Sequence, residues 1–204
     1  MNSGLVNLNL VSAEELFDTI LIEKLNNLNL PAWIDTAVYE KLYEIMNKTF
    51  VFAGSTRKIQ RFRAGNLLKD FIHKIDDTKQ FGHRRLLIYS THDTQLSVFL
   101  SALNIYDGLA PPFGATIFIE LYKNYQNVHY LRLFYLTDTE SETPQELPIN
   151  DCLSFNDLTQ TIPQQKNLCT FENFKTMTQD LLPVDWDYEC GNSISQNYSD
   201  IESK

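Results

Sequence analysis

The sequence of 204 residues predicts an α/β fold, and three observations carry that prediction. Apolar residues recur at three- and four-residue intervals up to about Ile75, which is the pattern of amphipathic helices. The short apolar run 86–89 predicts a strand that is covered on both faces. Segments 115–122 and 128–137 are rich in β-branched and aromatic residues and are separated by a polar turn, so they predict a hairpin. Helices alternating with strands in this way are typical of an α/β domain.

Three helices are predicted in the first 75 residues. Ser12 followed by Glu15 is a capping-box pattern that predicts the start of the first helix. Asp35 or Thr36 can cap the second helix, and Gly54 is predicted to end it. The third helix is indicated by the spacing of Leu67, Leu68, Phe71, Ile72 and Ile75.

His92 and Asp93 lie between the predicted strand and the helix that follows it. That helix is indicated by the stripe Leu96, Phe99, Leu100 and Leu103, and Gly108 and two prolines are predicted to stop it. Ligands bind at the carboxyl ends of strands in open α/β sheets, where the N–H groups of the following helix favour an anion. A structural interpretation is also open: Asp93 can cap a helix beginning near Thr94, with His92 as a half-buried turn residue.

The segment 89–113, YSTHDTQLSVFLSALNIYDGLAPPF, resembles the second catalytic segment of the histidine acid phosphatases. This family is the two-domain branch of the histidine phosphatase superfamily and includes the prostatic and lysosomal enzymes. The combination of His-Asp-Thr, an amphipathic helix and Tyr-Asp-Gly-Leu is far more specific than His-Asp alone. Other segments resemble further elements of the family, so the resemblance covers nearly the whole chain: 17–34, 61–75, 120–122, 147–148 and 185–190.

The resemblance implies a phosphoglycerate mutase-like histidine phosphatase fold, of which this chain would carry only the C-terminal half. Residues 1–80 would form part of a helical lid, residues 81–190 the C-terminal portion of the α/β phosphatase domain with part of its central sheet, and residues 191–204 a disordered tail. The implied reaction is hydrolysis of phosphate monoesters through a phosphohistidine, without metal or other cofactor. His92 would contact the phosphate and Asp93 would donate a proton to the leaving alcohol. An aspartate beside a bound phosphate feels a like charge that favours its protonated form, as a general acid at low pH requires.

The family's nucleophile segment, Arg-His-Gly-x-Arg-x-Pro, does not occur in this sequence. The run 82–85, Gly-His-Arg-Arg, has the wrong order and precedes the wrong strand. We therefore expect a chain from a partial gene model or a shortened transcript that is inactive alone. One alternative is a non-catalytic module, derived from the phosphatase fold, that binds a phosphate ligand or a protein. Another is a different α/β enzyme that uses Asp93 with a metal, although no second acidic cluster lies close in sequence.

Three cysteines occur in the chain. The resemblance implies a disulfide between Cys152 and Cys169, which would close a small C-terminal loop. It also implies that Cys190 is unpaired, because its family partner is not in this chain. A further family bridge falls on Ile22 and Thr116, and both of its cysteines have been replaced here.

The formal charge of −9 and the lack of a basic cluster argue against nucleic acid or an anionic membrane as a partner. No apolar run approaches the roughly 18 residues that span a bilayer, and the first residues lack the pattern of a signal peptide. The resemblance implies a secreted or lysosomal protein and allows a homodimer of the complete protein. Asn47-Lys48-Thr49 and Asn197-Tyr198-Ser199 match the glycosylation pattern, so a glycoprotein is expected.

The remaining polar candidates have structural interpretations. Glu120, in an apolar strand, is interpreted as a rim or ion-paired residue, and His73 and His129 as solvent-facing or structural. Trp186 is expected to anchor the C-terminus by packing. Residues 137–167 are predicted to form a long loop. Thr170 is expected to cap a last helix with inward-facing Phe171, Phe174, Met177 and Leu181.

Overall fold

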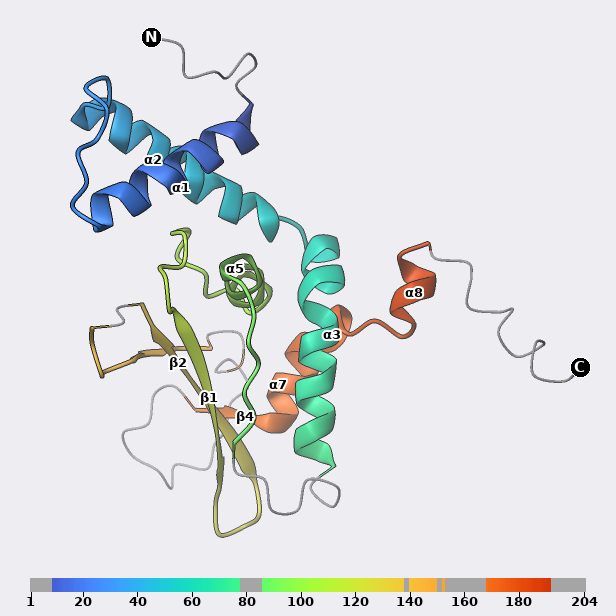
Figure 1. Cartoon of the computed structure of the whole chain (residues 1–204). Coiled ribbons are helices and arrows are strands. Elements are labelled where there is room, and N and C mark those ends of the chain that lie inside the picture. Colours follow the sequence, from blue (N-terminus) through green and yellow to red (C-terminus); the bar gives the residue numbers. More distant parts are fainter. Residues whose placement is uncertain (1–8, 78–85, 138–139, 150–151, 153–167, 192–204) are drawn as a thin grey trace, which may run out of the picture.

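The computed structural model describes residues 9–77, 86–137, 140–149, 152 and 168–191, and Figure 1 shows their arrangement. The fold is a mixture of helices and an antiparallel sheet. The described helices are α1 (Leu10–Leu25), α2 (Thr36–Ala53), α3 (Arg57–Asp76), α5 (Asp93–Ala102), α7 (Phe171–Thr178), α8 (Trp186–Glu189) and the short 3-10 helix η1 (Gln179–Leu181).

The sheet is an open antiparallel one built from β1 (Thr116–Lys123), β2 (His129–Leu136), β3 (Gln145–Leu147) and β4 (Cys169–Thr170). Its order is β1-β2-β3, and β4 also pairs with β2. The predicted β1–β2 hairpin is confirmed, with Ile119 opposite Leu133. The prediction of an uninterrupted loop over 137–167 is wrong at β3, where Glu146 forms two hydrogen bonds of 2.7 and 2.8 Å with Arg132 of β2. Three residues are too few to show a strand period in sequence.

Side-chain caps define where most of the helices begin. Asp35 accepts a 2.8 Å hydrogen bond from the backbone N–H of Val38, so of the two predicted candidates, Asp35 and Thr36, Asp35 is the cap of α2. The capping box predicted at Ser12 is wrong, because Asn9 caps α1 and accepts a 2.9 Å bond from the N–H of Ser12. Asparagine is as strong a cap as serine, and Asn9 comes first in the chain.

The main core lies between one face of the β1–β2 hairpin and the helices α3, α5 and α7. Leu68 of α3, Leu103 after α5 and Leu133 of β2 are fully buried there. Each such side chain contributes about 1.5 to 3 kcal/mol relative to an exposed one. The rings of Phe71 and Phe174 meet edge to face at 6.0 Å, which joins α3 to α7.

A second, smaller core lies between α1 and α2, which form a hairpin beyond α5 in Figure 1. Phe17, Met46 and Phe50 are its buried members. Asn47 of α2 accepts a 2.9 Å hydrogen bond from the backbone N–H of Ala110, in the segment that follows α5. The first glycosylation pattern therefore lies inside a helix and its asparagine is partly buried, while the second lies outside the described residues.

The C-terminal elements are held against α3 by its basic side chains. Arg57 forms two bonds of 2.6 Å with Asp180, and Lys69 donates a 2.7 Å bond to the carbonyl of Pro183. Trp186 donates its indole N–H to the carbonyl of Phe62 at 2.9 Å, as expected of an anchor for the C-terminus.

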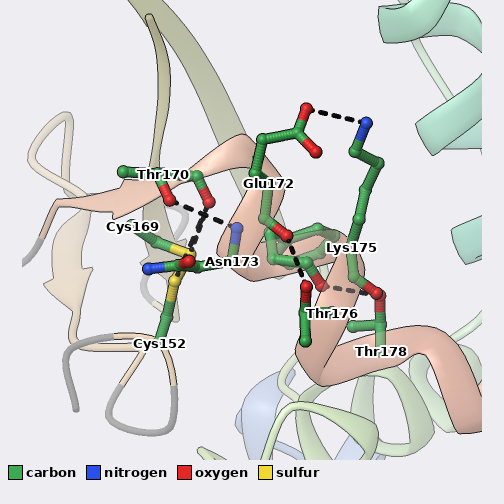
Figure 2. The surroundings of a disulfide bond; sticks show 9 residues. Cys152, Cys169, Thr170, Glu172, Asn173, Lys175, Thr176 and Thr178 are labelled. Carbon is green, nitrogen blue, oxygen red and sulfur yellow. Dashed lines mark hydrogen bonds and ion pairs between the residues drawn. A yellow bond between two sulfur atoms is a disulfide. The ribbon is translucent and has the colours of Figure 1, made fainter. Parts of the chain in front are cut away.

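A disulfide joins Cys152 to Cys169 of β4, with a Cα–Cα distance of 5.4 Å, and both cysteines are buried (Figure 2). Thr170 follows directly and caps α7 by accepting a 3.2 Å bond from the N–H of Asn173, so this predicted cap is confirmed. Cys190 is free and exposed. The bond therefore fixes the start of α7 at the edge of the sheet.

Candidate active site

The segment that leads into α5 is extended but belongs to no strand. The prediction that residues 86–89 form a buried strand is wrong for the described chain, because no described strand pairs with them. Leu86 and Ile88 are 74% and 81% exposed, whereas Leu87 and Tyr89 are 38% and 40% exposed. This alternation is the two-residue period of a strand with one covered face. The apolar run thus has a strand's pattern without the neighbours that would bury it.

Tyr89 attaches this segment to α3. Its hydroxyl donates a 2.8 Å hydrogen bond to Oδ2 of Asp70, and the ammonium of Lys74 donates to the same oxygen at 2.5 Å. Lys74 also lies 3.1 Å from the Tyr89 hydroxyl oxygen and 4.8 Å from the centre of its ring. The hydrogen bond from Lys74 is the main cause that holds the pKa of Asp70 below its usual value. Three side chains from two segments therefore share one hydrogen-bonded cluster.

His92 and Asp93 stand where this segment enters α5. His92 is the N-cap residue, with extended backbone, and its imidazole is exposed and makes no capping hydrogen bond. The interpretation of His92 as a half-buried turn residue is therefore wrong. Asp93 is the first residue of the helix and not its cap, because the extended backbone that defines the cap belongs to His92.

The carboxylate of Asp93 is exposed at the start of α5 and has a fixed orientation. Its Oδ1 accepts a 2.5 Å bond from the backbone N–H of Thr94 and a 3.1 Å bond from the Thr94 hydroxyl. A carboxylate held by one oxygen at the N-terminus of a helix is well placed to meet a ligand bound there. The structure thus brings both predicted site residues to one exposed helix start.

The charge of Asp93 contributes to the pKa of two residues in other parts of the chain. The pKa of Glu14 in α1 is raised by burial and then by the negative charges of Asp18 and Asp93. The pKa of Tyr106, after α5, is raised by burial, with smaller contributions from Asp107 and Asp93. Sequence reasoning missed both, because Glu14 is 79 positions away and only the packing of α1 brings it near. No spacing signal in the chain could have found it.

The other polar candidates lie away from this site. Glu120 is exposed on β1 and accepts a hydrogen bond from the Tyr122 hydroxyl, and His73 is exposed on α3. His129 is half-buried at the first position of β2. Across the described ranges, no three His, Cys, Asp or Glu side chains come together as a metal-binding group. None of the helices in that part of the chain is long and apolar enough to span a bilayer.

Comparison with known proteins gives the family of the chain. The profile described as "Histidine phosphatase superfamily (branch 2)" matches residues 15–136, which include His92 and Asp93. Lysosomal acid phosphatase from Rattus norvegicus is 28% identical over 206 residues, a match that covers 98% of this chain and 44% of the relative. "Putative acid phosphatase 5" from Caenorhabditis elegans is 24% identical over 191 residues, covering 92% of this chain and 42% of the relative.

Prostatic acid phosphatase from Rattus norvegicus is 27% identical over 179 residues, covering 86% of this chain and 43% of the relative. The chain therefore spans less than half the length of these curated relatives. The profile covers more than half of this chain. This match and the mixed helix-and-sheet fold both agree with the resemblance noted in the sequence. The chain belongs to branch 2 of the histidine phosphatase superfamily.

Proposed function

We propose that this chain supplies the proton-donor part of an acid phosphatase that hydrolyses phosphate monoesters through a phosphohistidine. The observation that carries the proposal is the pair His92 and Asp93 at the exposed start of α5, within the region that matches the family. The relatives that match nearly the whole chain are named acid phosphatases. Fold and names alone would leave the chemistry open, so the argument depends on this pair.

His92, at the N-terminus of α5, forms the phosphate-contacting side of the proposed site. A helix N-terminus favours an anion because its backbone N–H groups point outward and its dipole is positive there. The imidazole of His92 is exposed and free of a capping bond, so it can turn toward a phosphate oxygen. When protonated, it would add a positive charge beside the bound anion.

Asp93 is the proton donor in this proposal. The alkoxide that leaves a phosphate monoester needs a proton, and a carboxylic acid at hydrogen-bond distance supplies one in the transition state. The negative charge of the bound phosphate favours the protonated carboxyl, so the acid form would be kept at low pH.

The nucleophilic histidine and the arginines that neutralise phosphate oxygens belong, in this proposal, to a further segment. No Arg-His-Gly run occurs in the 204 residues. The outward side chains Leu86 and Ile88 and the edge strand β1 would be covered by that segment. An apolar extended run and an open sheet edge are both surfaces that an added strand fits.

The remaining organisation is part of the same proposal. Residues 1–80 form part of a helical lid, which the separate core of α1 and α2 supports, and residues 81–190 form the C-terminal portion of the phosphatase domain. The predicted tail, residues 191–204, lies outside the described residues except for Gly191. The protein is secreted or lysosomal, is a glycoprotein and is able to dimerise when complete. Its relatives named lysosomal acid phosphatase support the location.

The test is complementation. The chain is co-expressed with the part of rat lysosomal acid phosphatase that the match leaves out, and hydrolysis of p-nitrophenyl phosphate is measured at acidic pH. We expect activity that is absent from either part alone, since neither holds both the nucleophile and the acid. His92→Ala should abolish most of it, and Asp93→Asn and Asp93→Ala should lower hydrolysis, more strongly for phenyl phosphate than for p-nitrophenyl phosphate, while Asp187→Asn, an exposed change in α8, should leave it unchanged.

A soluble complex without turnover, or turnover indifferent to Asp93, would overturn the catalytic proposal. The chain would then be the alternative, a non-catalytic module derived from the phosphatase fold. That outcome predicts binding of inorganic phosphate or a phosphopeptide with no hydrolysis, which isothermal titration with the same chain would measure.

A further inference from the structure

The cluster of Tyr89, Asp70 and Lys74 joins the segment before α5 to α3. Tyr89 is three residues before His92, so the two Cα atoms are separated by about 10 Å of extended chain. No backbone hydrogen bond joins residues 86–91 to another described residue. Of the side chains from 86 to 92, Tyr89 alone makes a hydrogen bond to the rest of the described chain. The path into the site therefore has one polar attachment point.

On the other side of His92 and Asp93, the chain is held by the buried part of α5. α5 is anchored in the main core by Val98, Ala102 and, just after its end, Leu103, which are at most 1% exposed. His92 and Asp93 consequently lie between two anchors, the buried body of α5 and the Tyr89 cluster on α3. Figure 1 shows the segment entering α5 without any strand label along its length.

We propose that Tyr89, Asp70 and Lys74 are positioning residues that hold the segment before α5 and thereby set the placement of His92 and Asp93. The inference rests on the proposed function for its catalytic consequence, but its structural part stands without it. Asp70 is the centre of the cluster, because its Oδ2 accepts from both Tyr89 and Lys74. Lys74 neutralises the carboxylate and covers the ring of Tyr89.

The geometry gives each member a separate task. The Tyr89 hydroxyl attaches the segment to α3, and Leu87 and Tyr89 are less exposed than Leu86 and Ile88. Asp70 and Lys74 are four positions apart on α3, so the helix itself holds them side by side. The helix thus presents a preformed hydrogen-bond acceptor, Asp70, to a segment that makes no backbone hydrogen bond with another described residue.

The first experiment uses the 204-residue chain alone and measures backbone ¹⁵N order parameters by NMR. In the wild type, amides 86–92 are expected near the rigid value of about 0.85, and in Tyr89→Phe they are expected to fall below about 0.6. Asp70→Ala, which changes only the α3 side, should give the same loss at the same amides, and Asp70→Glu should restore part of it. Residues 94–102 of α5 should not change in any variant.

Tyr188→Phe is the matched control, because its hydroxyl is exposed and makes no hydrogen bond with a described residue. It should leave every order parameter unchanged. Rigid amides 86–92 in both Tyr89→Phe and Asp70→Ala would overturn the positioning role. A loss that spreads through α5 would also overturn it, because the cluster would then be only a general support of the fold.

The second experiment uses the complemented complex and two leaving groups. A misplaced proton donor matters most when the leaving group is poor, because p-nitrophenolate departs with little help and phenolate does not. In Tyr89→Phe, kcat for phenyl phosphate should fall about tenfold and kcat for p-nitrophenyl phosphate about twofold, with KM unchanged. Equal losses on both substrates would overturn the catalytic consequence. If the complex has no activity at all, the proposed function fails, while the NMR result still decides the positioning role.

Discussion

Arg61 of α3 and Glu189 of α8 form two parallel N–H···O bonds of 2.6 and 2.7 Å, although 128 residues separate them. Their side chains are only 23% and 22% exposed. Glu189 also accepts a 2.9 Å bond from the N–H of Val184, and Arg61 donates to the carbonyl of Asp180. A bidentate pair with these extra bonds is the strong form of an ion pair, so it fastens the C-terminal elements to α3.

The first prediction concerns the pH dependence of this pair. The hydrogen bonds that Glu189 accepts from Arg61 lower the pKa of Glu189 from 4.5 to about 2. A carboxyl with a depressed folded-state pKa contributes stability above its unfolded pKa and loses it as the pH falls through the folded value. Glu189→Gln should therefore destabilise the chain at pH 6, and the difference from wild type should shrink between about pH 4.5 and pH 2. Urea unfolding at a series of pH values measures this.

Asp187→Asn serves as the control for that series, because Asp187 is exposed in the same helix and has no ion-pair partner among the described residues. Its difference from wild type should be small at every pH. A Glu189→Gln difference that stayed constant down to pH 2 would contradict the charge-based account.

The second prediction concerns Gly65, which faces η1 from the middle of α3. Helix propensity alone predicts that Gly→Ala stabilises by roughly 0.5 to 1 kcal/mol. A Cβ at Gly65, however, would lie 2.2 Å from the carbonyl oxygen of Leu181 and 2.9 Å from Pro183. The obstacle is backbone, so overpacking should win and Gly65→Ala should lose about 1 to 3 kcal/mol. Asn66→Ala, the exposed neighbour, should be neutral or slightly stabilising in the same denaturation assay.

The third prediction concerns the disulfide between Cys152 and Cys169. The bridge spans a sequence separation of 17. In the chain-entropy account a loop of this size contributes about 3 kcal/mol. Cys152→Ala with Cys169→Ala should thus lower Tm by about 6 to 12 °C, at about 2 to 4 °C per kcal/mol for a chain of this size. Cys190→Ser should leave Tm unchanged, and non-reducing peptide mapping should find Cys190 unpaired. A Cys169–Cys190 peptide would refute the pairing.

The fourth prediction concerns the chain without any complement. Purified alone, it should hydrolyse p-nitrophenyl phosphate no faster than buffer at acidic pH, because His92 and Asp93 provide neither a nucleophile for phosphoryl transfer nor the arginine charges that stabilise it. Clear turnover that Asp93→Asn removes would show that the chain holds a nucleophile of its own. The Asp93→Asn protein is the control for contaminating phosphatases.

Local chemistry predicted most of the secondary structure. Residue type alone predicts Thr170 as a cap and narrows the cap of α2 to Asp35 or Thr36, because a cap is formed within three residues. The same locality explains the errors at the other helix starts. Ser12 and Asn9 are equally good caps, and the choice between them depends on how far the backbone stays helical. Asp93 was expected one position outside the helix that it begins.

Contacts between segments that are distant in the sequence could not be predicted from the pattern of residues. The apolar run 86–89 indicates a strand, but the pattern does not say whether a neighbour is present to bury it. The approach of Glu14 to Asp93 and the bond from Tyr89 to Asp70 follow from how α1 and α3 pack, and no periodicity records either. The candidate site residues could thus be named from the sequence, whereas the groups that surround and hold them could not.

The contacts between α3 and the C-terminal elements also bear on the order of synthesis. Arg57, Arg61 and Lys69 emerge from the ribosome more than 100 residues before their partners Asp180, Glu189 and Pro183. Until those partners are synthesised, the face of α3 around Gly65 is uncovered. The carbonyl and carboxylate groups that accept hydrogen bonds from the basic side chains of α3 are also absent. The main core therefore cannot close during most of translation, and a nascent chain stalled before residue 180 should be a strong client for chaperones that bind exposed apolar helices.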